Sequence, residues 1–158
     1  MNRIVPIQSL VGFLVMAIAL LSLASCDSSY GYYQFYDVPN RGWSWDDSLV
    51  FDLKVEPQDE NILVSNLNLS VRVNGDYEYQ NIILLLSGRG ARDTVRMSLQ
   101  DTKGQWLGNC NAGVCEVTMK LDSLNPKLSE ANTLVIQQWS RDPKLKGVVS
   151  LGLFMDKQ

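Results

Sequence analysis

The stretch Ser48-Leu49-Val50-Phe51-Asp52-Leu53-Lys54-Val55 (residues 48–55) alternates along its length. Successive side chains of a β-strand point to opposite faces, so a repeat of two predicts a strand with one buried face. No other segment of the chain shows this signal as clearly. The positions that we expect to face the core are Leu49, Phe51, Leu53 and Val55.

Several other short segments have strand patterns, and turn residues separate them. Residues 82–86 form a continuous apolar run, which is typical of a central strand buried on both faces. No long helical periodicity interrupts the series. The pattern therefore predicts an all-β fold, an antiparallel β-sandwich of about eight strands. The remaining strand-like segments are 32–38, 62–73, 93–100, 114–121, 133–139 and 148–155.

The first 25 residues have the features of an export signal. A short basic start is followed by an apolar run from Leu10 to Leu23, which is shorter than the roughly 20 residues of a membrane span. The four residues Leu23-Ala24-Ser25-Cys26 then resemble a bacterial lipobox, in which the cysteine is lipidated and becomes the N-terminus. The alternative is an ordinary signal peptide followed by a chance cysteine. We expect a lipoprotein signal peptide over 1–25, a lipidated tether over 26–31 and a β-sandwich domain over 32–158.

Lipidation would attach the mature chain to a membrane through Cys26. Each buried CH₂ group contributes about 0.8 kcal/mol, so several acyl chains, palmitate among them, hold a protein stably where one chain does not. The export signal also places the chain in an oxidising compartment, where Cys110 and Cys115 favour a disulfide over metal or redox chemistry. Residues 111–114 could form the tip of a hairpin whose arms this bridge would join. Closing so short a loop stabilises a fold by roughly 2 kcal/mol.

The composition argues against several kinds of chemistry. The chain has no histidine, which excludes Ser-His-Asp and Cys-His nucleophilic sites and histidine-ligated zinc. The acids that a glycosidase would need would have to come from residues such as Asp46, Asp47 and Glu116, which lie at turns or on strand faces and are expected to be solvated. A net charge of −3 without a basic cluster gives no footprint for nucleic acid. We therefore expect no enzyme, no metal, no cofactor and no nucleic-acid partner.

Three segments suggest a family. Pro39-Asn40-Arg41-Gly42-Trp43, Gly104-Gln105-Trp106-Leu107-Gly108 and residues 141–148 (RDPKLKGV) follow the lipobox in an order and spacing that resembles the gliding-motility lipoprotein GldH family. The resemblance covers nearly the whole chain after Cys26. It implies an outer-membrane lipoprotein, without enzymatic activity or known ligand site, associated with surface motility and with machinery that also serves protein export.

Other features qualify what the resemblance implies. The pair Cys110 and Cys115 stands where the family pattern implies a cysteine-free loop, and Ser150 stands where it implies an acidic residue. Members also occur in bacteria that do not glide, so motility can name the family without naming this protein's task. We expect the domain to be attached to the outer membrane and to face the periplasm.

Four tryptophans are the candidate contact residues. Trp43 and Trp106 lie beside glycines in turn-like settings, so we expect them to be exposed at one end of the sandwich, whereas Trp139 lies on a strand and is expected in the core. Arg141 is either an interface anchor or part of a simple turn. The first hypothesis is a subunit or assembly factor of a motility- or secretion-associated complex that binds envelope proteins through Trp43, Trp106 and Arg141. The alternative is a glycan-binding lipoprotein in which Trp43, Trp45 and Trp106 stack on sugar rings.

Three short matches suggest a modification. Asp47-Ser48-Leu49, Asp93-Thr94-Val95 and Asp122-Ser123-Leu124 look like the Asp-Ser/Thr-apolar sites at which exported proteins of the same bacterial group are O-glycosylated. Glycosylation of Ser48, Thr94 or Ser123 would require these hydroxyls to face solvent.

Overall fold

The computed structural model describes residues 30–53, 66–125, 128 and 131–156. The predicted export signal, Cys26 and the predicted strand positions 54, 55 and 62–65 lie outside the described residues. The described elements are β-strands, as predicted. Three of them have two or three residues, and the other eight match the expected number. In chain order the strands are β1 (Tyr30–Asp37), β2 (Trp43–Ser44), β3 (Ser48–Asp52), β4 (Asn68–Asn74), β5 (Asn81–Gly88), β6 (Ala91–Ser98), β7 (Asn109–Asn111), β8 (Val114–Lys120), β9 (Thr133–Gln138), β10 (Lys144–Leu145) and β11 (Val148–Asp156).

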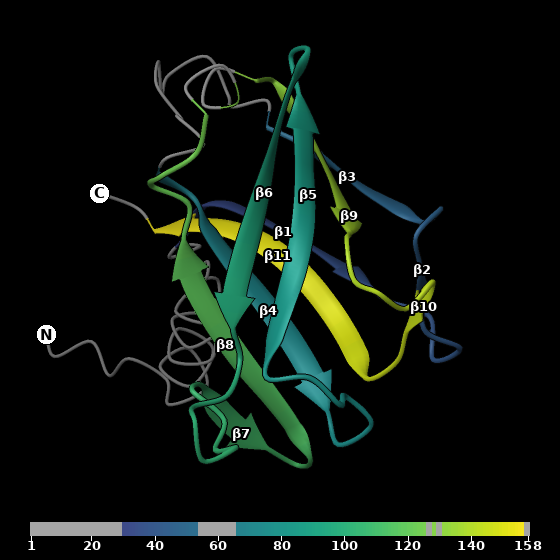
Figure 1. Ribbon diagram of the computed structural model, residues 1–158. Coiled ribbons are helices and arrows are strands. Elements are labelled where there is room, and N and C mark those ends of the chain that lie inside the picture. Colours follow the sequence, from purple (N-terminus) through teal and green to yellow (C-terminus); the bar gives the residue numbers. More distant parts are fainter. Residues whose placement is uncertain (1–29, 54–65, 126–127, 129–130, 157–158) are drawn as a thin grey trace, which may run out of the picture.

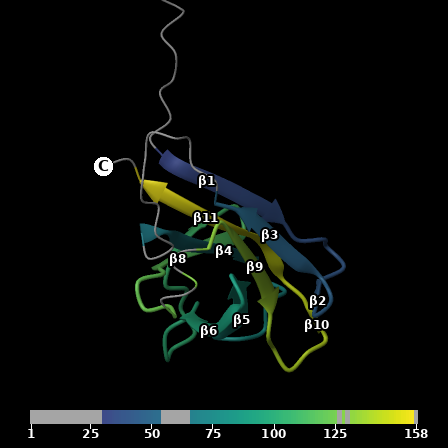
Figure 2. The ribbon, with the colours of Figure 1, turned by 90° about the horizontal axis from the view of Figure 1, so that it is seen from above.

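The strands form two main antiparallel sheets that face each other. The five-stranded sheet has the order β1-β11-β4-β8-β7, and the four-stranded sheet has the order β3-β9-β5-β6 (Figure 1). A two-stranded ribbon of β10 and β2 lies beside them. The view from above separates the two layers and shows β2 and β10 at the far end of β1 (Figure 2). The predicted antiparallel sandwich is thus confirmed.

The core lies between the two sheets and follows from the alternation in each strand. Leu69, Val71 and Val73 of β4 are buried, and so is Phe51 of β3, the central inward position of the stretch that predicted the fold. Burying an apolar side chain of this size stabilises the folded state by about 1.5–3 kcal/mol. On the facing strand β5, the inward residues Ile82, Leu84 and Leu86 are also buried and complete this layer.

Two local predictions need correction. The first strand begins at Tyr30 and not at the predicted residue 32, because Tyr30 already pairs with Asp156 of β11. The second concerns residues 82–86, which form a central strand between β9 and β6 but are not buried on both faces. Ile83 and Leu85 are only half-buried, since no further described strand covers that side of the sheet.

The disulfide between Cys110 and Cys115 is confirmed, and it joins the arms of a hairpin. β7 and β8 meet at a two-residue turn, Ala112-Gly113, in which both residues have positive φ (48° and 81°). Such mirror-image turns match the twist of the flanking strands. The two cysteines are cross-strand neighbours with Cα atoms 4.0 Å apart, so the bridge forms without displacing either strand.

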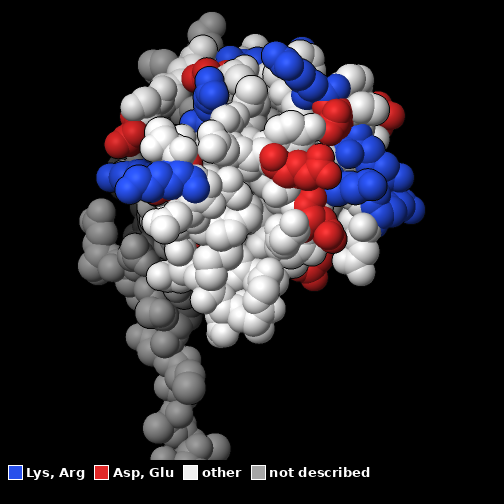
Figure 3. Space-filling model, turned by 60° about the horizontal axis from the view of Figure 1, so that its bottom comes forward, with Lys and Arg blue, Asp and Glu red and all other residues white. Residues whose placement is uncertain are grey.

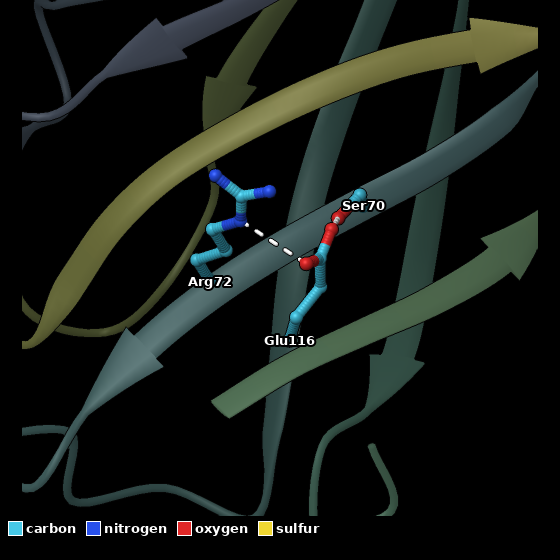
Figure 4. A network of polar contacts seen from close by, with 3 residues as sticks. All are labelled: Ser70, Arg72 and Glu116. Atoms are coloured by element: carbon cyan, nitrogen blue, oxygen red, sulfur yellow. Dashed lines mark hydrogen bonds and ion pairs between the residues drawn. The ribbon is translucent and has the colours of Figure 1, made fainter. Parts of the chain in front are cut away.

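A polar network lies on the outer face of the five-stranded sheet (Figure 4). The Arg72 side chain forms an ion pair of 3.2 Å with Glu116, which also accepts a 2.6 Å hydrogen bond from the buried hydroxyl of Ser70. The Arg72 guanidinium lies 5.0 Å from the centre of the Phe35 ring. Ser150 is the register partner of Arg72 on β11, and Glu116 is its partner on β8. Arg72 thus lies between Ser150 and Glu116, and its ion pair is made with the β8 side.

Candidate partner-binding site

Trp43 is not a surface residue, and the prediction that it is exposed is wrong. Its side chain is 0% exposed and lies in the core cluster. The indole Nε1 donates a 2.8 Å hydrogen bond to the carbonyl of Asp47, which satisfies the one polar group of the ring. Trp43 pairs with Leu145 of β10, about a hundred positions along the chain. It therefore closes the end of the core, and it cannot contact a partner in this conformation.

Trp106 and Arg141 are not brought together. Trp106 is half-buried against the core and bridges to Gln100, whereas its neighbour Leu107 is exposed. Arg141 is exposed in the segment between β9 and β10. The segment that leads from β6 to β7 and the segment between β9 and β10 lie on opposite sides of the molecule in Figure 1. The three predicted contact residues therefore do not form one surface.

Two other tryptophans are exposed close to Arg141. Trp45 is 45% exposed and Trp139 is 61% exposed, so the expectation that Trp139 packs in the core is wrong. Trp45 Nε1 donates a 3.1 Å hydrogen bond to the carbonyl of Ser140, and the Trp45 amide donates one of 3.1 Å to the carbonyl of Pro143. These bonds hold the turn after β2 against the segment between β9 and β10. We name Trp45, Tyr79, Trp139, Arg141 and Asp142 the tryptophan corner.

A buried glutamine fixes the shape of the corner. Gln138 is 1% exposed, and its amide nitrogen donates to the carbonyl of Asp142 at 3.1 Å and to that of Trp43 at 3.5 Å. Its amide oxygen accepts a 2.8 Å hydrogen bond from the Ser140 amide. One side chain thus satisfies three backbone groups of the loop and its support. The loop that carries Trp139 and Arg141 is therefore tied to β2 and β9 by three hydrogen bonds of one side chain.

Tyr79 connects the loop between β4 and β5 to the corner. Its hydroxyl donates to the Asp142 carboxylate, and this hydrogen bond raises the pKa of Tyr79 above its usual value. Tyr79 also packs edge-on against Tyr77, with ring centres 5.9 Å apart. Burial raises the pKa of Tyr77, whose hydroxyl donates to the Asn81 carbonyl at 2.9 Å. Tyr79 thus contacts Asp142 of the corner directly, and Tyr77 supports the Tyr79 ring.

A shallow cavity of about 140 Å³ adjoins Tyr79. Acidic and basic groups line it together, and the lower face of the molecule shows the two signs side by side next to a broad uncharged area (Figure 3). Such mixed charge does not select a ligand of one sign. Among the described residues no group of histidine, cysteine or acidic side chains is arranged to hold a metal ion. The lining residues are Asp76, Glu78, Tyr79, Asp142, Lys144 and Lys146.

The remaining candidates have structural roles or are exposed. Asp47 accepts a 3.2 Å hydrogen bond from the Ser44 amide, and Glu116 belongs to the network with Arg72. The hydroxyl-bearing residues Ser48, Thr94 and Ser123 are exposed, which meets the steric condition for glycosylation, and the modification itself stays a prediction.

Comparison with known families decides the class of the chain. The family described as GldH lipoprotein matches residues 30–155, which include every described strand except the last residue of β11. The chain belongs to the GldH lipoprotein family. Membership confirms the predicted resemblance and implies attachment to a membrane through lipid. The described part of this GldH-family chain contains no helix long and apolar enough to cross a membrane.

Other comparisons add little to the family match. No curated protein matches the sequence of this GldH-family chain. A solved structure of tomato aspermy virus is similar over 92% of this chain and 94% of its own, with 13% identity and a TM-score of 0.37. A score this low carries no argument about fold or function.

Proposed function

We propose that this GldH-family protein is a non-enzymatic, lipid-anchored subunit or assembly factor of a motility- or secretion-associated complex at the outer membrane. In this proposal Cys26 carries the lipid, the domain faces the periplasm, and the tryptophan corner binds another envelope protein. The observation that carries the proposal is the exposure of Trp45 and Trp139 on a loop pair fixed by Gln138. Tryptophan and arginine are enriched among residues that dominate binding energy.

The position of the corner relative to the anchor supports this role. Tyr30, where β1 starts, follows Cys26 by four positions, and an extended chain spans at most about 3.6 Å per residue. The lipid therefore lies within about 15 Å of this end of the domain. β1 leads away from it, and β2 and β10 lie beyond the far end of β1 (Figure 2). A lipid at Cys26 leaves the corner free to meet partners away from the membrane surface.

The experiment is a mild cross-linking pull-down of the full-length, lipidated protein from intact outer membranes, followed by mass spectrometry. The variants W45S, W139S and R141E should each lose companion proteins that the unchanged protein recovers. Y33S is the matched control, because Tyr33 is also 55% exposed but lies on β1 of the other sheet. Equal recovery by all four variants, with unchanged thermal unfolding, would exclude the corner as the binding site.

Glycan binding is the second candidate, and the two exposed tryptophans favour it in an altered form. The predicted platform of Trp43, Trp45 and Trp106 is not available, because Trp43 is buried. Trp45 and Trp139 are the indoles that could stack on a sugar ring. Tryptophan fluorescence should then shift on titration with envelope or dietary glycans, and the W139S variant should show a smaller shift. Fluorescence unchanged across such a panel would remove this candidate.

A further inference from the structure

The outer face of the four-stranded sheet carries an apolar strip that extends the tryptophan corner. Val50 of β3 is 47% exposed and Trp139, directly after β9, is 61% exposed. Val135 of β9 and Ile83 and Leu85 of β5 are half-buried on the same side. The inward neighbours on these strands, Leu84, Leu134 and Ile136, are fully buried, which fixes the outward direction of this set.

The register makes these side chains neighbours across three strands. Val50 pairs with Val135, and Val135 pairs with Ser87 of β5. Leu85 pairs with Gln137, one outward position further along β9, and the Trp139 amide donates to the carbonyl of Ile83 at 2.8 Å. Directly opposed side chains lie about 4.5–5.5 Å apart at Cβ. Val50 and Val135 are therefore directly opposed, whereas Val135 and Leu85 are diagonal neighbours at about 7–8 Å. The polar side chains of Ser87 and Gln137 lie between the apolar ones.

Two arginines border the strip on the edge strand β6. Arg92 pairs with Ser87 and Arg96 pairs with Ile83, so both lie on the outer face beside the apolar residues. Both are exposed, and neither forms an ion pair with a described residue. Arg92 also lines a shallow hollow together with Ser87 and Val135, which places its side chain at the strip. Asp52 is the sole acidic residue at the outward positions of these four strands, although the chain as a whole carries a net charge of −3.

Protection of a free strand edge does not explain the whole arrangement. Charged side chains on an edge strand prevent it from pairing with other chains, and this accounts for arginines on β6. It does not account for an exposed tryptophan and valine on strands further from that edge. An apolar centre with arginine at its border is instead the composition of a protein interface.

We propose that this surface, the arginine-bordered face (Val50, Ile83, Leu85, Arg92, Arg96, Val135 and Trp139), docks a partner protein with an apolar centre and carboxylates that meet Arg92 and Arg96. The inference deepens the proposed function, because Trp139 joins the face to the tryptophan corner. Opposite charges across an interface steer encounter and fix the register of the two partners. Two arginines are fewer than the four to eight basic residues of an anionic-lipid site, so a protein is the better match.

The test places amines at the two arginine positions. R92K and R96K variants of the full-length protein are treated in intact cells with a carbodiimide, which joins amines to carboxylates in contact, and cross-linked peptides are sequenced. Aspartate or glutamate of another protein should be joined to the R92K and R96K side chains at least tenfold more often than to the native Lys103. This lysine is exposed outside the face and serves as the internal control. The R92E/R96E double variant should lose the same companion while unfolding at the unchanged temperature.

Further outcomes separate this inference from the proposed function. A photo-reactive phenylalanine at position 45 reports on the corner alone. Cross-linking there to a partner, with no excess at R92K and R96K, would overturn the arginine-bordered face and leave the corner standing. Absence of partner products at all three positions would overturn both. Carbodiimide products with acidic polysaccharide in place of protein would also overturn the docking of a protein on this face.

Discussion

The ring of Phe35 covers Gly152 on the neighbouring strand so closely that a Cβ at Gly152 would lie 2.3 Å from a ring carbon. A G152A variant must therefore displace the ring or the strand, and overpacking of this kind costs about 1–3 kcal/mol. The free energy of unfolding in urea should fall by that amount. G75A is the control, since no atom lies within 4 Å of a Cβ built at Gly75. Equal losses in the two variants would show that the ring does not set the constraint.

Glu116 is expected to contribute more to the stability of the fold than its ion-pair partner Arg72. In E116A the Ser70 hydroxyl, which is fully buried, loses its acceptor at a cost of about 1–3 kcal/mol. R72A removes a partly exposed ion pair, worth about 0–1 kcal/mol, together with its contact with Phe35. Chemical unfolding should also show that S70A/E116A recovers part of the loss in E116A. A double variant less stable than E116A would contradict this account of the network.

The hairpin disulfide should make a modest contribution to stability. Its cysteines are five positions apart, and closing so small a loop is worth about 2 kcal/mol. The C110S/C115S variant should unfold at a correspondingly lower urea concentration but remain folded at 25 °C. A thiol reductant should lower the urea concentration at which the unchanged protein unfolds to the value of the double variant. The same reductant should not change the unfolding of the double variant. Unfolding of the whole domain by reductant would contradict a local role.

Replacement of Gln138 should loosen the corner. Q138L leaves the Ser140 amide and the Asp142 carbonyl without their buried partner, at a cost of about 1–3 kcal/mol. Hydrogen exchange at the Ser140 amide should accelerate, and companion recovery in the pull-down should fall. Q137L is the matched control, because Gln137 is half-buried and makes a longer 3.4 Å contact with Trp45. Equal acceleration in both variants would contradict a special role for Gln138.

Buried tyrosines predict a loss of stability in alkali. Burial raises the pKa of Tyr77 above the ordinary value of 10.0, so near and above pH 10 the unfolded chain loses this proton while the folded chain keeps it. The free energy of unfolding should therefore be unaffected by this group well below pH 10 and should fall as the pH rises further. Tyr32, whose pKa burial also raises, contributes in the same direction. Between pH 8 and 11 the free energy of unfolding in urea should decline less steeply for Y77F than for the unchanged protein. Parallel curves for the two proteins would contradict this role of Tyr77.

The sequence allowed prediction of the sandwich, the disulfide hairpin and the family, because these depend on local alternation, spacing and motif order. The tryptophans depend on long-range structure. Trp43 is buried because its strand pairs with residue 145, a contact that no nearby residue signals. Trp139 is exposed because Leu134 and Ile136 point inward and Gln138 takes the next inward position. The alternation along β9 alone would have predicted an inward Gln138 and an outward Trp139. The polarity of the two side chains predicts the opposite, because glutamine is usually exposed and tryptophan is usually largely buried.

The pairing of β1 with β11 sets the order in which the five-stranded sheet can assemble. β1 lies at one edge of this sheet, and β11 is its neighbour there. The first described strand therefore has no partner until the last one, residues 148–156, is available. Residues 30–37 stay unpaired until then, so the edge of the sheet closes last. A chain cut short before β11 leaves β1 unpaired and open to proteolysis.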